Sequence, residues 1–169
     1  MGSSVSEFTN GYLSKGLAVP NRYKVTFNSP AGADDVVDVF CHAVTLPSRA
    51  MMTFEHRSHV GPTYQAPYSG SYEAITCSFY ADPDLNSRQF FDKWQQKVTN
   101  VESDTNNYWD EFVGTIIIET RDREDKPHYK VKIYDAYPIN INSVDLSYGE
   151  RNNFVSISVS FAFKYWKEE

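Results

Sequence analysis

The chain has 169 residues, of which 41% are hydrophobic and 15% aromatic, and its formal net charge is -6 at pH 7. This length and aromatic share predict one folded domain with a hydrophobic core and exclude a disordered body. The negative charge disfavours binding to nucleic-acid phosphates, and no apolar stretch is long enough for a membrane span or a secretory signal, so we expect a protein made in the cytosol.

The first half of the chain predicts an arm followed by strands. Residues 1–20 are polar and predict an N-terminal arm ahead of a single β domain over residues 21–169. Alternating apolar side chains predict a strand over residues 21–28, and β-branched and aromatic residues predict a second over residues 36–44. Cys41 and Cys77 are expected to be buried thiols, because free cysteine behaves as a small hydrophobic residue.

Residues 50–70 differ from the rest of the chain. Their apolar content is thin, charges are interspersed, and Gly61-Pro62 marks a turn between two extended runs. The pattern predicts a hairpin that projects from the body. Because a two-stranded hairpin alone is marginal in water, we expect a neighbouring molecule to support it.

A strand over residues 71–81 is followed by the one clear helix, predicted over residues 83–99. Asp82 or Asp84 can cap its start, and Pro83 suits the first turn. Its apolar side chains recur at helical spacing on one face, which should cover a sheet. These are Phe90, Phe91, Trp94 and Val98.

The C-terminal part predicts an acidic loop over residues 99–112 and strands over residues 114–121, 128–141 and 144–148. A last strand over residues 154–166 alternates apolar side chains with small ones. The predicted fold class is mainly β (α+β), an antiparallel β-barrel or sandwich with one flanking α-helix, a projecting hairpin and an N-terminal arm. The predicted core side chains are Phe90, Trp94, Ile157, Val159, Phe161 and Phe163.

The residues that could perform chemistry do not form a recognisable set. His56 and His59 have an i, i+3 spacing that suits a helical metal site, but they stand in an extended stretch without a third ligand beside them. Cys41 and His42 are strand neighbours and face opposite sides, so they do not form a nucleophile and base pair. There is no phosphate-binding glycine loop. We therefore expect no enzyme activity, no metal and no cofactor.

Five segments, taken in order, resemble the tail tube proteins of contractile-tailed bacteriophages. The segments are the aromatic-containing first strand NRYKVTF; FCHAVTLPSR with Cys41, Ala43, Leu46 and Pro47; the helix with Phe90, Phe91 and Trp94; YDAYPINI with Tyr137, Pro138, Asn140 and Ile141; and the last strand ending in Tyr165-Trp166. The resemblance covers roughly residues 20–166.

The resemblance implies a structural virion protein. Six copies would form a ring, and rings would stack into a hollow tail tube that the sheath drives through the host envelope and that conducts DNA. The implied partners are further copies of the chain, the tail sheath protein and the baseplate tube initiators, with DNA passing through the lumen without specific binding. Assembly would take place in the host cytoplasm, without a membrane anchor.

Two groups of residues are candidates for these contacts. The candidates for contact between subunits are Met51, Phe54, His56, His59, Tyr64, Tyr68, Phe8 and Tyr12. The small face of the last strand, Ser156, Ser158 and Ser160, suits either the lumen wall or close packing against another subunit, and both remain open. Alternative functions are a baseplate tube initiator, the tube of a type VI secretion or other contractile injection system, and, from another class, a carbohydrate-binding β-sandwich.

Overall fold

The computed structural model describes residues 5, 19–32, 38, 40–57, 59–100, 105–144, 146, 147, 149 and 154–169. Its strands are β1 (Tyr23–Asn28), β2 (Cys41–Val44), β3 (Ala50–His56), β4 (Tyr64–Ser71), β5 (Ile75–Tyr80), β6 (Thr99–Asn100), β7 (Thr105–Asn106), β8 (Gly114–Arg121), β9 (Pro127–Ile141), β10 (Ser156–Ala162) and β11 (Tyr165–Glu168). The helices with described bounds are α3 (Asn86–Val98) and α4 (Trp109–Phe112), and the single described residues 5, 38 and 40 are also helical.

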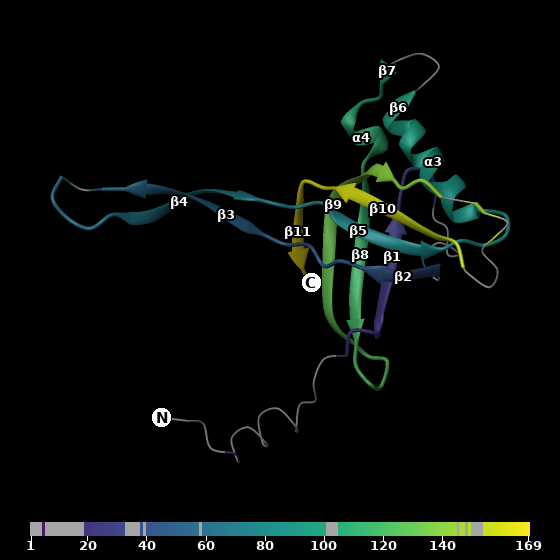
Figure 1. The fold of residues 1–169 in the computed structure, drawn as a ribbon, viewed down its shortest axis with the longest axis horizontal. Coiled ribbons are helices and arrows are strands. Elements are labelled where there is room, and N and C mark those ends of the chain that lie inside the picture. Colours follow the sequence, from purple (N-terminus) through teal and green to yellow (C-terminus); the bar gives the residue numbers. More distant parts are fainter. Residues whose placement is uncertain are drawn as a thin grey trace.

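The main sheet has seven antiparallel strands in the order β1-β8-β9-β10-β5-β2, with β11 beside β9. In Figure 1, β1, β8 and β9 run steeply across β10, β5 and β2, so the sheet folds over into two layers. The expected antiparallel, mainly β architecture is confirmed. Within the described residues the sheet does not close into a barrel, because its two end strands, β1 and β2, do not pair with each other.

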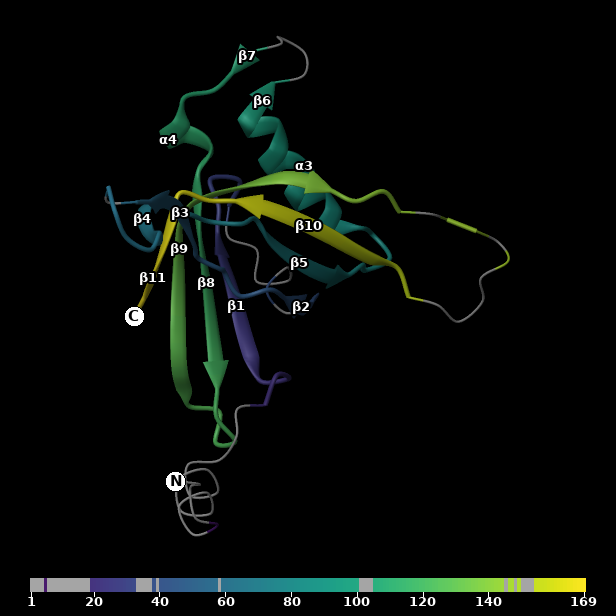
Figure 2. The same cartoon turned by 60° about the vertical axis from the view of Figure 1, so that its left-hand side comes forward.

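The corner between the layers lies in β9. Its first part pairs with β8 as far as Ala136, and its last part, from Tyr137 to Ile141, pairs with β10. Between these parts Asp135 has a φ of 54°, a left-handed conformation that bends the strand. Such bends let one strand take part in both layers of an orthogonal sandwich. Figure 2 shows the same corner from the side.

Aromatic rings from both layers and from α3 fill the core. The Phe161 ring of β10 lies with its centroid 5.8 Å from those of Phe27, Phe91 and Trp94. All four side chains are fully buried. The Trp94 Nε1–H also donates a 2.7 Å hydrogen bond to the Phe112 carbonyl oxygen, which ties α3 to α4. Helix α3 therefore closes one end of the sandwich (Figure 2).

The start of α3 differs from the prediction. The helix begins at Asn86 rather than at residue 83, because Leu85 has a φ of 54° and interrupts the helical backbone. Pro83 lies in the preceding turn. Asp82 does act at the helix start, since its Oδ1 accepts a 2.8 Å hydrogen bond from the Asn86 backbone N–H.

Three predicted strands need correction. The last strand is two strands, β10 and β11, and Phe163 between them is half-buried against the core rather than inside it. The second strand begins at Cys41 and not at residue 36, because the described residues 38 and 40 are helical; the Asp38 carboxylate accepts a 3.0 Å hydrogen bond from the Phe27 backbone N–H. Of residues 144–148, those described lie outside any strand, while the predicted loop 99–112 contains β6, β7 and α4.

The two cysteines lie on the neighbouring strands β2 and β5. Both are free thiols; Cys77 is fully buried and Cys41 is half-buried. A hydrogen bond with the Cys41 thiol, together with burial, raises the pKa of the Cys77 thiol well above its usual range. The expectation of buried thiols therefore holds fully for Cys77 and in part for Cys41.

At Gly114, β1, β8 and α3 approach one another closely. A Cβ atom there would lie 2.6 Å from the Asn28 carbonyl oxygen and 2.7 Å from Trp94 Cζ2. We expect Gly114→Ala to lower the free energy of unfolding by about 1–3 kcal/mol, the usual effect of overpacking. Chemical denaturation measures it, and Gly70→Ala is the matched control because its Cβ would meet only ordinary contacts. Equal stability of both variants would contradict the close approach.

Candidate assembly surfaces

The hairpin of β3 and β4 extends away from the two-layered body (Figure 1). Seven backbone positions pair between its strands, from Ala50 with Ser71 to His56 with Tyr64. Every residue of β3 is exposed, and so are most residues of β4. The predicted projecting hairpin is therefore present, and within one chain it covers little of the core.

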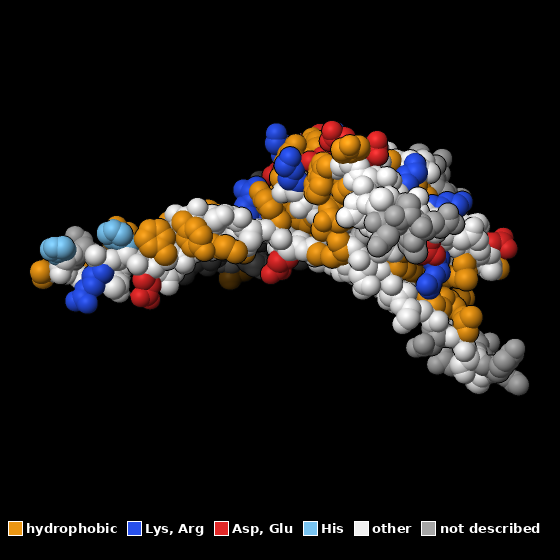
Figure 3. All heavy atoms as spheres, turned by 90° about the horizontal axis from the view of Figure 1, so that it is seen from above, with side chains coloured by type: hydrophobic (Ala, Val, Ile, Leu, Met, Phe, Trp, Pro, Cys, Tyr) orange, Lys and Arg blue, Asp and Glu red, His pale blue; other side chains and the backbone are white. Residues whose placement is uncertain are grey.

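One face of the hairpin carries a row of aromatic side chains, which we call the aromatic ladder: Phe54, His56, Tyr64 and Tyr68. The Phe54 ring centroid lies 6.2 Å from those of His56 and Tyr68, and the His56 and Tyr64 centroids are 5.2 Å apart. The Tyr68 hydroxyl also donates to the Met52 sulfur, at 3.5 Å. Figure 3 shows hydrophobic side chains in a row along the hairpin, with histidines near its tip.

The aromatic ladder is exposed to an extent that is unusual for rings in a folded chain. Phe54 is 46% exposed, Tyr64 58% and Tyr68 63%. The opposite face is polar, with a 3.3 Å hydrogen bond from Thr53 to Gln65. Contiguous exposed apolar side chains mark surfaces that bind another molecule. The geometry thus makes the aromatic ladder a candidate assembly surface.

The remaining contact candidates lie at different places. Met51 is 61% exposed and precedes Met52, the residue whose sulfur accepts the Tyr68 hydrogen bond. His59 is exposed near the hairpin tip. The structure thus brings four of the predicted residues into the aromatic ladder, whereas Met51 shares the opposite face with Thr53, and His59 lies outside the two strands. Phe8 and Tyr12 lie outside the described residues.

The predicted serine face continues onto a second strand. The Ser158 and Ser78 hydroxyls are 3.0 Å apart, and Ser160 and Thr76 are 3.4 Å apart. Together with Ser156 these side chains form what we call the hydroxyl face, which spans β10 and β5 and carries no charge. The sequence prediction missed Thr76 and Ser78, although both occupy the small alternate positions of their strand.

The outer face of the other layer has a different chemistry, with charges of alternating sign. Lys24 is paired with Glu119 and Glu119 with Lys130 across neighbouring strands, and the Lys130 ammonium lies 2.8 Å from the Glu169 carboxylate. The hydrogen bond between these two groups lowers the pKa of Glu169 and raises that of Lys130. Lys130 and Glu169 therefore form an ion pair within the chain on this face.

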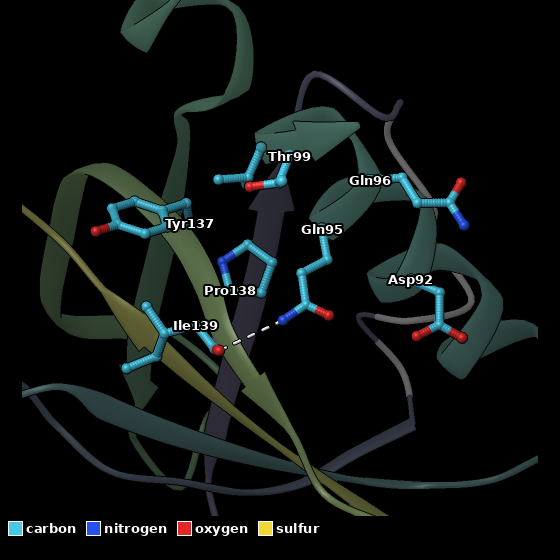
Figure 4. A pocket seen from close by; sticks show the side chains of 8 residues that line it. Asp92, Gln95, Gln96, Thr99, Tyr137, Pro138 and Ile139 are labelled. Atoms are coloured by element: carbon cyan, nitrogen blue, oxygen red, sulfur yellow. Dashed lines mark hydrogen bonds between the residues drawn. The ribbon is translucent and has the colours of Figure 1, made fainter. Parts of the chain in front are cut away.

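A hollow of about 550 Å³ lies between α3 and the last part of β9 (Figure 4). Gln95 points across it and donates a 3.4 Å hydrogen bond from Nε2 to the Ile139 carbonyl oxygen. Asp92 is the one ionisable carboxylate among its lining residues. The hollow therefore offers amide and carbonyl groups, without a nucleophile and base in hydrogen-bonding reach.

The described part of the chain also brings no three histidine, cysteine, aspartate or glutamate side chains together in a way that could hold a metal ion. His56 contacts aromatic rings, and His42 stacks on Tyr80 with centroids 4.2 Å apart. None of the helices among the described residues is long and apolar enough to cross a membrane.

The sequence model of the phage tail tube protein family matches residues 18–169. The chain belongs to the phage tail tube protein family. This family assignment confirms the resemblance drawn from the sequence and makes the chain a structural component of a tail-like particle. No curated protein matches the chain.

Solved structures of the same fold come from contractile injection systems. One is a chain of the sheath-tube complex of an extracellular contractile injection system, PVC, in the extended state, at 14% identity, 99% coverage of each chain and a TM-score of 0.70. Another is from the tube-terminating cap of the anti-feeding prophage, at 14% identity, 91% coverage of each chain and a TM-score of 0.71. At these identities the likeness shows a shared fold.

Proposed function

We propose that this tail tube protein forms rings of six copies that stack into a hollow tube, which a contractile sheath drives through a host envelope and through which DNA passes. The observation that carries the proposal is the family match over residues 18–169. The exposed hairpin supports it, because a stacked assembly gives the aromatic ladder a partner that a single chain does not have.

In this proposal the aromatic ladder, Met51 and His59 contact neighbouring copies, and so do Phe8 and Tyr12 of the arm. The hydroxyl face forms the lumen wall. Its hydroxyls pair with one another across β5 and β10, and it carries no cation to hold DNA phosphates. Close packing of the same face against another subunit is the competing role. The tail sheath protein and the baseplate tube initiators are the further partners.

A second candidate function is the tube of a contractile injection system. It is favoured by the fold shared with a chain of the PVC sheath-tube complex, which covers 99% of this chain. Such a tube would have the same ring and stack but a protein cargo in place of DNA. The content of the lumen in isolated particles distinguishes the two, and either outcome leaves the ring and stack proposal in place.

Electron microscopy of the purified protein over a range of concentrations tests the proposal. We expect hollow tubes or six-fold rings, which become more abundant as concentration rises. Because some tubes need a nucleus, the same measurement is repeated with the baseplate tube initiators added. Monomers under both conditions would contradict the proposal and direct attention to glycan binding, which a glycan array measures.

A further inference from the structure

The hairpin is joined to the body by two short segments outside any strand. The backbone pairing of β2 with β5 ends in a 3.0 Å hydrogen bond from the Thr45 N–H to the Thr76 carbonyl oxygen. The backbone pairing of β3 with β4 begins where Ala50 pairs with Ser71. Between them lie residues 46–49 and 72–74. The direction of the hairpin relative to the body depends on what holds these two segments.

Arg49 lies in the first segment and contacts two aromatic rings. Its guanidinium carbon is 5.6 Å from the centroid of the Tyr72 ring and 5.1 Å from that of the Trp166 ring. Tyr72 belongs to the second segment. Trp166 belongs to β11, where it pairs with Ile133 of β9. One side chain therefore connects both segments to a strand of the body.

Two further contacts reinforce the same place. The Tyr72 ring lies 5.7 Å from the ring of Phe163, which packs against the core between β10 and β11. The Ser48 hydroxyl donates a 3.4 Å hydrogen bond to Glu73 Oε2, which joins the two segments directly. The base of the hairpin is thus fixed at one point to the corner of the sandwich.

The chemistry of arginine suits this role. A guanidinium group is planar and permanently charged, so it can stack on aromatic faces while its edge remains hydrated. A lysine ammonium is a compact charge and does not stack in this way. The Trp166 indole N–H is buried without a hydrogen-bond partner in the structure.

We propose that Arg49 is a positioning residue that fixes the direction of the hairpin by clamping Tyr72 to Trp166. The proposal rests on the proposed function in one respect: a fixed direction presents the aromatic ladder to a neighbouring copy in one orientation. Loss of the clamp leaves the backbone pairing of β2 with β5 and of β3 with β4 intact. It allows the hairpin to change its direction about its base.

The direct test is the distance between two spin labels, one at the hairpin tip and one on the body. Val60, which is 96% exposed, and the exposed Asp110 of α4 are replaced by labelled cysteines in a Cys41→Ser background. Labelled chains are mixed with an excess of unlabelled protein, so that the distance is measured within one chain. We expect Arg49→Met to broaden the distance distribution about twofold or more, and Arg49→Lys to give an intermediate width.

Lys167→Met is the matched control. Lys167 is the sequence neighbour of Trp166, and its ammonium lies 5.7 Å from the Tyr165 ring centroid, so the variant removes the same kind of contact without touching the hairpin. We expect the width of the control to equal that of the parent. An unchanged width for Arg49→Met, or equal broadening by Lys167→Met, would overturn the clamp.

Tube formation gives a second measurement. We expect Arg49→Met to form tubes at least about tenfold more slowly than the parent, while its thermal unfolding midpoint stays close to that of Lys167→Met. If the parent protein forms no tubes either alone or with the baseplate tube initiators added, the proposed function fails, but the label distances still decide the clamp. If the parent forms tubes and Arg49→Met matches it in both rate and width, the clamp alone is wrong.

Discussion

Replacing Phe161 with aspartate should leave the chain unfolded. The Phe161 ring is fully buried and lies 5.8 Å from Phe27, Phe91 and Trp94, so it joins β10, β1 and α3. Removing such a ring costs roughly 3–5 kcal/mol, and a carboxylate buried without a partner adds a further penalty of several kcal/mol. This sum is comparable to the whole stability of a domain, which is about 5–15 kcal/mol.

Circular dichroism and the soluble yield measure this effect. The matched control is Ser156→Asp, which places the same charge on the same strand but at an exposed position of the opposite face. We expect the control to fold with a free energy of unfolding within about 0.5 kcal/mol of the parent, the usual range for surface substitutions. A soluble, folded Phe161→Asp protein would contradict the register of β10.

Deleting residues 51–69 should give a folded subunit that no longer assembles. The deletion joins Ala50 to Gly70 and removes the aromatic ladder, while the fully buried core residues lie elsewhere in the chain. We expect the unfolding free energy to change by about 1 kcal/mol or less, because little buried apolar area is lost. Electron microscopy should show no tubes at concentrations where the parent forms them.

Two double variants distinguish the contribution of the aromatic ladder to assembly from that of the hairpin as a whole. Phe54→Ser with Tyr68→Ser removes two rings of the ladder, and Thr53→Ala with Gln65→Ala alters the polar face of the same two strands. If each ring contributes as an interface anchor, roughly 2 kcal/mol or more, the first pair should raise the concentration needed for assembly at least about tenfold. Normal tubes from the first pair would contradict the ladder's role.

The fold was predictable where local side-chain pattern and structure agree. Alternation of Val25 and Phe27 in β1, and of Ile157, Val159 and Phe161 in β10, reflects one buried face per strand. The thin apolar content of residues 50–70 marked the exposed hairpin. Helix α3 was recognisable because Phe90, Phe91 and Trp94 recur at helical spacing.

The corners of the sandwich could not be predicted from the sequence, and the reason is physical. Apolar alternation continues from Val155 to Tyr165, although the chain changes layers at Phe163 and Lys164. A bend in the backbone leaves the alternation unchanged, so the pattern does not reveal it. Leu85 adopts a left-handed conformation with no glycine, asparagine or aspartate to signal it, and Asp135 does so inside an alternating strand pattern. Each is held by its surroundings; Asp135, for example, lies 3.6 Å from the Lys164 ammonium at the second corner.

The candidate surfaces were predictable in part. Ser156, Ser158 and Ser160 stood out because they alternate with large apolar side chains. Their partners Thr76 and Ser78 depend on the pairing of β5 with β10, which are separated by about half of the chain. The Arg49 contacts depend on β11, at the far end of the sequence. Long-range pairing of this kind leaves no local signal.

The continuous strand β9 has a mechanical consequence. Because its first part pairs with β8 and β11 and its last part with β10, a pull on one layer reaches the other along covalent bonds of a single strand. Neither a loop nor a packed interface has to carry that load. In the proposed tube, β9 would therefore let each subunit resist shear between its two layers through its own backbone.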